Sequence, residues 1–404
     1  MIVSMAWRNI WRNKVRSVVI ITSIALGLVA GIFIMGLYDG MLTDRLNTVI
    51  RQEVSHLQLH NPEFQKDYEA IYSIEHAMEI VELIRSEDYV KAVSARTIAH
   101  GMLATSTGSA GVQITGVQQD DEHLVSRLND KLIEGEGLVG DRRNPIVIGK
   151  KLADKVKISL GSKLVLTFTD REYNIVSAAF RVTGIYQSAN APLDERNVYV
   201  QSADLNRLML LEDACHEIAV LLNSDNELVV AQQKLSGRYP ELMIENWQQL
   251  SPETKLMIET TDTYSIIFIG IIMLALMFGI INTMLMAILE RTREIGMLVA
   301  LGMNKLRLFL LVLWETVLLT LAGAPFGLIL SWLVIMYFNQ SGIDISSFSG
   351  AAMSGFGFSS LLYPEFPWLK IPLVLYIVGV TALLASLFPS YKALRLVPVE
   401  AMRQ

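Results

Sequence analysis

The sequence predicts an α-helical membrane protein with four transmembrane helices and a large mixed α/β extracytoplasmic domain inserted between helices 1 and 2. Of its 404 residues, 52% are apolar and 18% are charged, whereas a soluble domain carries roughly 25% charged residues. Four stretches exceed the ~20 residues that cross a bilayer, and Glu315 is their one charged residue. About 225 mostly polar residues separate the first two stretches, enough for one or two folded domains.

These stretches set the expected order of segments along the chain. Apolar helices are expected over 17–38, 263–289, 308–338 and 371–391. Around them lie an N-terminal helix over 1–16, the polar domain 39–262, a loop 290–307, a second loop 339–370 and a tail 392–404. The first apolar run exceeds the roughly 7–15 residues of a signal-peptide core, so we expect it to remain as an anchor.

Basic residues set the expected orientation, because short cytoplasmic segments are enriched in Lys and Arg. Eleven Lys and Arg residues flank the first helix on its N-terminal side, lie in loop 290–307 or follow the fourth helix, whereas loop 339–370 holds only Lys370. We therefore expect both termini and loop 290–307 in the cytoplasm, and the domain 39–262 on the opposite side.

Charge and cysteine content exclude several classes of function. The domain 39–262 carries 22 basic and 34 acidic residues. We therefore expect it not to lie flat on the anionic headgroups of a membrane. The net charge of −6 for the chain argues against nucleic acid as a partner. The single cysteine, Cys215, excludes a disulfide scaffold and a cysteine-based metal site, and its acidic neighbours Asp213 and Glu217 disfavour a reactive thiolate.

The polar domain shows both strand and helix patterns. Alternation predicts strands over 54–60, 163–169, 179–185 and 197–200, and helical spacing predicts helices over 74–85, 203–211 and 228–235. Residues 189–193, with Pro192, predict a loop, and the small, polar stretch 96–111 predicts a break between two sub-regions. We expect the helices at both ends of the domain to continue from the first two membrane helices.

The N-terminal residues 7–14 favour a helix that lies at the membrane surface. A four-residue repeat places Trp7 and Trp11 on one helical face, with Arg8 and Arg12 beside them. Trp prefers the bilayer interface, and Arg can extend its charged end to the headgroups. A simple basic flank is the alternative, but it leaves the paired tryptophans unexplained.

Within the apolar stretches, five residues are candidates for packing or function. Gly27 and Gly31, and likewise Gly323 and Gly327, are four residues apart, a spacing that lets membrane helices approach closely. Glu315 is an intramembrane acid and therefore a functional candidate. It lies about two turns beyond Arg307, so a structural pair with a basic residue of a neighbouring helix is an equal alternative to a proton or substrate site.

Motifs for catalysis, cofactors and metals are weak or missing. Gly135-Glu-Gly137-Leu-Val-Gly140 matches a dinucleotide fingerprint but lacks a preceding hydrophobic strand and carries acids that would repel a pyrophosphate. The chain holds no P-loop motif and no G-x-S-x-G elbow. His56 and His60 share a strand face without a third ligand, which predicts surface residues rather than a metal site. We expect no catalytic, cofactor-binding or metal-binding residue, and no enzymatic activity.

The loop after the second apolar helix is the most informative segment. Its residues 290–302 combine charges with an apolar stripe of Ile295, Leu298 and Val299, and Gly302 is placed as a C-terminal cap. This pattern predicts a short amphipathic helix. Such a helix can lie on the membrane or dock in a groove of a cytoplasmic partner, and charge alone favours the membrane flank.

The same segment resembles a known family. Glu290-Arg-Thr-Arg-Glu-Ile-Gly296, followed by Ala300-Leu-Gly302 and Glu315, is similar to the FtsX-like permease family of ABC transporters, with its macrolide-exporter (MacB) and lipoprotein-releasing (LolC/LolE) members. Pro398-Val-Glu-Ala401 resembles the closing motif of the family, and Phe180-x-Val182-x-Gly184 a pattern of its outer domain. The segment 55–60 resembles the lipoprotein-releasing branch most.

This resemblance implies a permease subunit in a bacterial inner membrane, with a MacB-type periplasmic core domain. It implies a separate P-loop ABC ATPase dimer as partner, so ATP binds the partner and no cofactor binds this chain. The implied coupling helix consists of Glu290, Arg291, Arg293, Glu294, Ile295, Gly296, Leu298 and Gly302. A second permease copy or paralogue would complete the dimer, and a periplasmic carrier or outer-membrane duct would receive the cargo.

The resemblance implies transmission of ATP-driven motion to the periplasmic domain, and we expect extraction of lipoproteins for outer-membrane localisation. One alternative is export of a drug, peptide or lipid from the periplasm. Another is a non-transporting regulator of a periplasmic hydrolase. Two departures bear on the cargo: no clear proline-centred hook for a lipoprotein carrier is visible, and loop 339–370 is long for the exporter branch.

Overall fold

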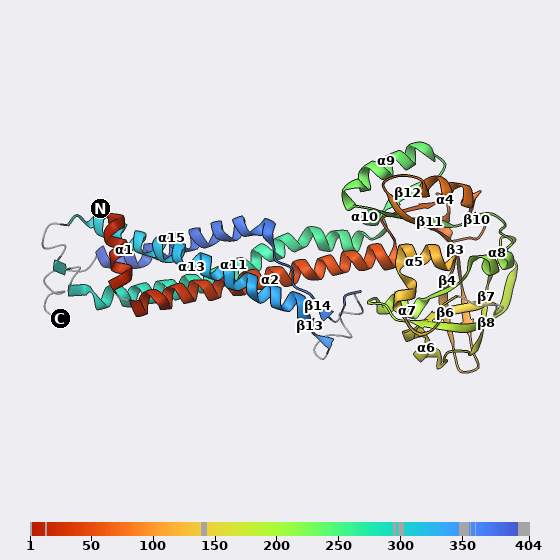
Figure 1. Cartoon of the computed structure of the whole chain (residues 1–404), viewed down its shortest axis with the longest axis horizontal. Coiled ribbons are helices and arrows are strands. Elements are labelled where there is room, and N and C mark those ends of the chain that lie inside the picture. The colour runs from red at the N-terminus through yellow and green to blue at the C-terminus, as the bar shows by residue number, and fades with distance from the viewer. Residues whose placement is uncertain are drawn as a thin grey trace. The chain divides into compact units, whose positions relative to one another are not determined.

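A computed structural model of the chain describes residues 2–12, 14–138, 144–293, 296–297, 303–346, 355, 357–359 and 361–394. It comprises two compact units (Figure 1). The helical unit contains Met1–Leu42, Ile258–Ile343 and Leu361–Gln404, and the α/β unit contains Thr43–Met257 and Asp344–Ser360. Four transmembrane helices and a large mixed α/β domain between the first two are therefore the architecture of the chain.

Four long helices make up the helical unit: α2 (Lys14–Thr48), α11 (Pro252–Glu290), α13 (Lys305–Ser341) and α15 (Ile371–Leu394). Each contains a window apolar enough to cross a membrane. Ile24, Leu28 and Ile32 of α2 are fully buried and share a core with Met273 of α11 and Val374 of α15. The last turn of α2 and the first turn of α11 belong to the α/β unit, as the helical patterns at both ends of the domain predict.

Short elements accompany these helices. The N-terminal α1 (Ile2–Arg12) precedes α2, and its Trp7 and Trp11 rings contact edge to face with centroids 5.9 Å apart. Both tryptophans are about half exposed. Between α13 and α15 lie β13 (Ile343–Asp344), β14 (Leu361–Leu362), which pair in a two-stranded sheet, and η4 (Trp368–Lys370).

A ten-stranded mixed sheet forms the centre of the α/β unit, with the order β12-β1-β11-β3-β4-β9-β6-β8-β5 and with β7 paired to β3 and β8. Two of its pairs, β4 with β9 and β6 with β8, are parallel. Its strands are β1 (Leu57–His60), β3 (Val90–Ala104), β4 (Ser109–Val117), β5 (Leu132–Gly135), β6 (Pro145–Gly149), β7 (Lys163–Thr169), β8 (Ile175–Tyr186), β9 (Asn197–Gln201), β11 (Glu217–Leu222) and β12 (Met243–Asn246). The short β2 (Ile74–Glu75) and β10 (Ala214–Cys215) pair separately.

Helices surround this sheet. They are η1 (Val49–Glu53), α3 (Phe64–Asp67), α4 (Ala77–Arg85), α5 (Gln119–Ser126), η2 (Leu128–Lys131), α6 (Lys150–Val156), α7 (Ala191–Arg196), α8 (Ser202–Met209), η3 (Asp225–Glu227), α9 (Leu228–Arg238) and α10 (Trp247–Leu250). Apolar faces of α6 and α8 pack on the sheet, with Leu152 and Leu205 fully buried beside Ile114 and Val198.

The stretch 96–111 is not the break that its small residues predict. It contains most of a long hairpin, in which β3 and β4 pair from Arg96 opposite Val117 to Ala104 opposite Ser109. Gly101 lies in this hairpin opposite Val112. A Cβ at this position would collide with the carbonyl oxygen of Thr167 on β7. The glycine therefore marks close strand packing rather than a linker.

Three local predictions also differ from the structure. Residues 191–196 form helix α7 instead of a loop, with Pro192 in the first turn, where its missing N–H costs no hydrogen bond. The helix expected over 74–85 begins at Ala77, because Ile74 and Glu75 pair with β10. The strand expected from Val54 begins at Leu57.

His56 and His60 are buried, which corrects their prediction as surface residues. Strand β1 lies between β11 and β12, so both of its edges are covered. His56 Nε2 lies 2.7 Å from the Asp225 carboxylate, and His60 Nε2 lies 3.2 Å from that of Glu245. Neighbours distant in the sequence account for this burial.

Candidate functional site

A polar link joins three segments at one end of the helical unit. Arg291 follows α11 directly, and its Nη1 lies 3.8 Å from Oε1 of Glu315 on α13. Its Nη2 donates a hydrogen bond of 3.4 Å to the carbonyl oxygen of Asn9 on α1. The Glu315 side chain is 7% exposed. Of the two alternatives for this acid, the structure provides the pair with a basic residue from a neighbouring segment.

The expected coupling helix is only partly described. Glu290 ends α11 and is exposed, as is Arg293, whereas Gly296 is buried. Glu294, Ile295, Leu298 and Gly302 lie outside the described residues. The next helix, α13, begins with Asn304 as N-cap, whose side chain accepts a hydrogen bond of 3.1 Å from the backbone N–H of Leu306.

The glycines expected at helix contacts lie between packed helices. An added Cβ at Gly27 would collide with Leu276 of α11, and one at Gly31 would only touch Met273 at 3.9 Å. On α13, a Cβ at Gly323 would lie 3.2 Å from Ile24, and one at Gly327 would lie 2.9 Å from Leu28. These glycines thus lie where α2 meets α11 and α13.

A further pair of glycines was missed, although it has the same four-residue spacing. A Cβ on Gly36 would lie 2.6 Å from the carbonyl oxygen of Glu365, and one on Gly40 would collide with that of Tyr363. The backbone N–H of Glu365 donates to the Gly36 carbonyl at 2.9 Å. In the same unit, Lys370 pairs with Asp39 at 2.6 Å. The segment before α15 is therefore fixed against α2.

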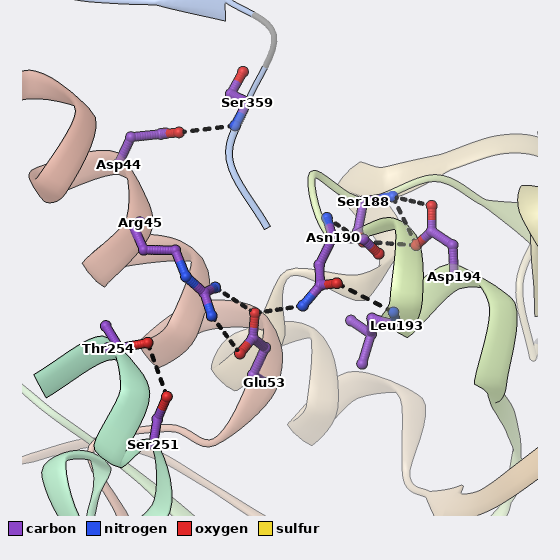
Figure 2. A network of polar contacts seen from close by, with 10 residues as sticks. All are labelled: Asp44, Arg45, Glu53, Ser188, Asn190, Leu193, Asp194, Ser251, Thr254 and Ser359. Carbon is purple, nitrogen blue, oxygen red and sulfur yellow. Dashed lines mark hydrogen bonds and ion pairs between the residues drawn. The ribbon is translucent and has the colours of Figure 1, made fainter. Parts of the chain in front are cut away.

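In the α/β unit, Glu53 lies at the centre of a polar network (Figure 2). Its carboxylate accepts hydrogen bonds of 2.5 and 3.2 Å from the Arg45 guanidinium and one of 2.6 Å from Asn190 Nδ2. The side chains of Arg45 and Glu53 are 12% and 16% exposed. Glu53 ends the π-helical turn η1, and π-helical turns occur frequently at functional sites.

The network extends in two directions from Glu53. Asn190 is the N-cap of α7, and its side-chain oxygen accepts from Leu193 N at 3.3 Å. Beside it, the buried Asp194 accepts from the backbone N–H of Ser188 at 3.0 Å and from its hydroxyl at 2.6 Å. Towards the loop 357–359, Ser359 N donates to Asp44 at 3.3 Å (Figure 2). The network therefore joins three segments that are distant in sequence.

Burial shifts the pKa of two groups near this network. The pKa of Asp194 rises to about 6 because burial disfavours its anion, although the Ser188 hydrogen bonds act in the opposite direction. The pKa of Lys131 falls to about 8, again because of burial, and its Nζ donates to the Ser126 carbonyl at 2.7 Å. Neither group has the arrangement of a nucleophile and base that catalysis needs.

A buried ionic cluster lies at the centre of the sheet. Arg96 donates to Glu122 at 2.9 and 2.8 Å and to Glu217 at 2.7 Å, and Ser94 donates to Glu122 at 2.8 Å. Burial opposes ionisation of Glu122, but the charge of Arg96 and the hydrogen bonds to this acid together outweigh burial and lower its pKa. The arrangement is that of a structural cluster in which one buried cation is hydrogen-bonded to two carboxylates.

Among the described residues, no group of three His, Cys, Asp or Glu side chains has the geometry of a metal site. Cys215 is buried, and burial raises the pKa of its thiol far above the usual value. Gly135 and Gly137 adopt φ of +87° and +85° near β5, and Gly140 lies outside the described residues.

Two family models match the chain. The MacB-like periplasmic core domain matches residues 17–237, and the FtsX-like permease C-terminal domain matches residues 266–398. The uncharacterized ABC transporter permease YvrN of Bacillus subtilis is 23% identical over 447 aligned positions, which cover 99% of this chain and 98% of that protein.

The names of two other relatives state what those proteins transport. The macrolide export ATP-binding/permease protein MacB of Campylobacter jejuni is 23% identical in an alignment that covers 84% of this chain and 54% of that protein. The lipoprotein-releasing system transmembrane protein LolC of Haemophilus influenzae is 22% identical over 74% of each chain. Since the periplasmic core model alone matches more than half of the residues, the chain belongs to the FtsX-like ABC transporter permeases with a MacB-like periplasmic core domain.

Proposed function

We propose that the chain receives ATP-driven motion from a separate P-loop ABC ATPase dimer at residues 290–302 and passes it to the α/β unit. The link from Arg291 to Glu315 and Asn9 is the observation that carries this proposal. Through this link, a displacement at the start of the coupling segment acts on α11, α13 and α1 together. ATP stays on the partner, and this chain has no enzymatic activity of its own.

The proposed orientation places both termini and loop 290–307 in the cytoplasm and the α/β unit outside a bacterial inner membrane. The distribution of basic residues along the sequence supports it. The half-exposed Trp7 and Trp11 of α1 fit a helix at the cytoplasmic membrane surface, where tryptophan is enriched.

The proposed second permease copy or paralogue packs against α11. Ile271, Leu274 and Phe278 are more than half exposed, and a Cβ on Gly279 would have nothing within 4 Å. One turn further, Asn282 is exposed, and its side-chain amide makes no hydrogen bond in the described part of the chain. An amide inside a bilayer favours a polar partner on a neighbouring helix, which the same residue of a second copy supplies.

The proposed cargo is a lipoprotein, extracted from the inner membrane for outer-membrane localisation with a periplasmic carrier as acceptor. The similarity to LolC over three quarters of both chains supports this choice. The segment 55–60, which resembles that branch, is buried and contains β1 between β11 and β12, so it reflects the fold rather than the cargo. Similarity to MacB favours the second candidate, export of a drug, peptide or lipid through an outer-membrane duct.

Co-purification with the cognate ABC ATPase tests the proposed docking. The double variant Glu294→Lys with Gly296→Pro should abolish the complex, because it reverses a charge and breaks the expected helix. Lys163→Glu, on the α/β unit, is the control that changes a charge elsewhere and should leave the complex intact. Retention of the ATPase by the double variant would refute docking at 290–302.

Depletion of the protein tests the cargo. Lipoproteins should accumulate in the inner membrane if the chain releases them. Normal lipoprotein sorting would reject this cargo, and drug sensitivity would then support the exporter. A defect in cell-wall cleavage, with normal sorting and normal drug resistance, would support the third candidate, an FtsX-like regulator of a periplasmic hydrolase.

A further inference from the structure

A small cavity of about 340 Å³ opens on the α/β unit between the end of α3, strand β3 and the turn that joins β7 to β8. Its volume is in the range of small-molecule sites. Its side chains include three aromatic rings, Tyr68, His100 and Tyr173, and three acids, Asp67, Glu69 and Asp170. The Arg45–Glu53 network has no residue in this lining.

The cavity is negatively charged. No Lys or Arg side chain contributes to the lining. The nearest basic residues in sequence have partners elsewhere, Lys66 with Glu63 at 2.7 Å and Arg171 with Glu75 at 2.9 Å. Burial lowers the pKa of His100, so this ring is neutral at physiological pH. Burial works against the anion of Asp170, but hydrogen bonds from Asn174 and Glu172 hold its pKa below the usual value.

The aromatic rings are held in place yet remain accessible. Tyr68 contacts His100 edge to face with ring centroids 5.0 Å apart, and it contacts Phe64 in the same way at 5.4 Å. Tyr173 donates from its hydroxyl to Glu69 at 2.7 Å. Tyr68 is 51% exposed and Tyr173 is 59% exposed, so both rings present free surface next to the acids.

Both tyrosines adopt a backbone conformation that favours glycine or asparagine. Tyr68 caps α3 with φ of +53°, and Tyr173 has φ of +65° in the β7–β8 turn. Bulky residues rarely adopt this region, and such strain costs on the order of 1–3 kcal/mol and clusters at functional sites. Glycine or asparagine would form the same turns with less strain, so asparagine can replace either tyrosine without changing the turn.

We propose that this cavity binds an organic ammonium cation, with the methylated or alkylated nitrogen against the faces of Tyr68 and Tyr173 and its charge balanced by Glu69 and Asp170. Aromatic rings attract such cations through their negative faces, and the attraction grows as the site excludes water. A metal ion is the weaker alternative because the described residues hold no group of three ligands. The site is independent of the proposed coupling to an ATPase.

Choline and its uncharged isostere 3,3-dimethylbutan-1-ol provide the test. Binding of each is measured by saturation-transfer NMR on the full chain in a maltoside detergent, whose headgroup carries no ammonium. Choline should bind and the isostere should bind at least about tenfold more weakly, the difference expected from a partly desolvated cation–π contact. Equal binding of both compounds, or no binding of choline, would overturn the proposal.

The strained tyrosines supply variants that keep the fold. Tyr68→Asn with Tyr173→Asn removes both rings and suits the left-handed backbone, so the thermal stability of the protein should hold while choline binding weakens about tenfold. Leu210→Asn is the matched control: Leu210 is exposed, has φ of +59° and lies outside the lining. The Leu210→Asn variant should bind choline as tightly as the wild type does. Undiminished choline binding by the double variant would overturn the site.

A charge variant separates the acids from the rings. Glu69→Gln keeps the shape of the side chain and its contact with the Tyr173 hydroxyl but removes one negative charge. Choline affinity should fall and show less dependence on salt, while the weak binding of the uncharged isostere stays the same. An equal fall for both compounds would indicate a distorted cavity and would overturn the role of charge.

Discussion

The two units bury charge in different ways. In the α/β unit, Arg96 makes three hydrogen bonds of 2.7 to 2.9 Å to Glu122 and Glu217. In the helical unit, Arg291 approaches Glu315 only to 3.8 Å and makes a 3.4 Å bond to Asn9. The first cluster meets the geometry that a stable buried pair needs. The second is a longer contact between segments that we propose to move.

This difference separates two roles of a buried ion pair. Removing one partner of the Arg96 cluster leaves a charge in the core, whereas the 3.8 Å contact of Arg291 with Glu315 is longer than a hydrogen bond. We therefore expect substitutions at Arg96 to act on folding and substitutions at Arg291 to act on coupling.

The largest effect is expected for Arg96→Met. Glu122 and Glu217 would lose their cation while buried, which costs about 3–5 kcal/mol. Hydrogen exchange at the backbone amides of β3 and β11, detected by mass spectrometry, measures this loss of stability. Arg85→Met is the control, because its pairs with Glu82 and Asp121 are half exposed and contribute about 1 kcal/mol or less. Equal losses of stability in both variants would show that the buried Arg96 cluster contributes no more than the partly exposed pairs of Arg85.

Asp194 is an intermediate case, buried and accepting hydrogen bonds but without a cation in contact among the described ion pairs. Its pKa is about 6 in the folded chain and 3.8 as a free side chain, so the folded state binds protons more tightly. Stability should therefore rise as the pH falls from 7.5 to 4, by at most about 3 kcal/mol relative to Asp194→Asn.

The same hydrogen-exchange measurement at both pH values checks this prediction. The Asp194→Asn variant lacks the titrating group but keeps Lys131 and Lys151, the nearby cations that act on Asp194, so the difference between the two proteins isolates this carboxyl group. If the wild type lost stability relative to the variant on acidification, the carboxylate would be the favoured form in the folded chain.

Arg291 and Glu315 should show a smaller coupling energy. A double-mutant cycle with Arg291→Gln and Glu315→Gln in detergent should give about 1 kcal/mol, in the range of polar contacts between membrane helices. The single variants should lose ATP-driven activity while the protein remains folded. A coupling energy as large as the loss of about 3–5 kcal/mol expected for Arg96→Met would identify the pair as structural.

The smallest effect on a single chain is expected for Asn282→Leu. The exposed amide makes no hydrogen bond in the described residues, so the fold should be unchanged, and self-association in the membrane should weaken by about 0.6 kcal/mol per contact. Analytical ultracentrifugation in detergent measures this, with Leu333→Ala, at an exposed position of α13 outside the proposed contact, as the control. Stronger association of the leucine variant would reject a polar contact at this position.

Much of the architecture follows from local patterns. The apolar stretches lie in α2, α11, α13 and α15, and the strand predicted over 163–169 is β7. The hairpin of β3 and β4 was missed because Gly101, Gly108 and Gly111 interrupt its pattern. In this hairpin, cross-strand pairing overrides local propensity.

The candidate sites depend more on distant contacts. A pair between Glu315 and a neighbouring basic residue was predictable as an alternative, because an acid inside a bilayer needs a partner. The contact of Glu53 with Asn190 was not, since 137 residues separate them and neither belongs to a motif. Burial of His56 and His60 depends on β11 and β12, which come more than 150 positions later in the chain.

Labelling of Arg293→Cys tests the central claim most directly. The native Cys215 is buried, and Arg293 is exposed, so a new thiol at position 293 should dominate the reaction; the variant in a Cys215→Ala background is the control. A membrane-impermeant maleimide should react from the cytoplasmic side only, and the cognate ATPase should protect the thiol. Reaction from the outer side, or no protection by the ATPase, would contradict the proposed coupling segment.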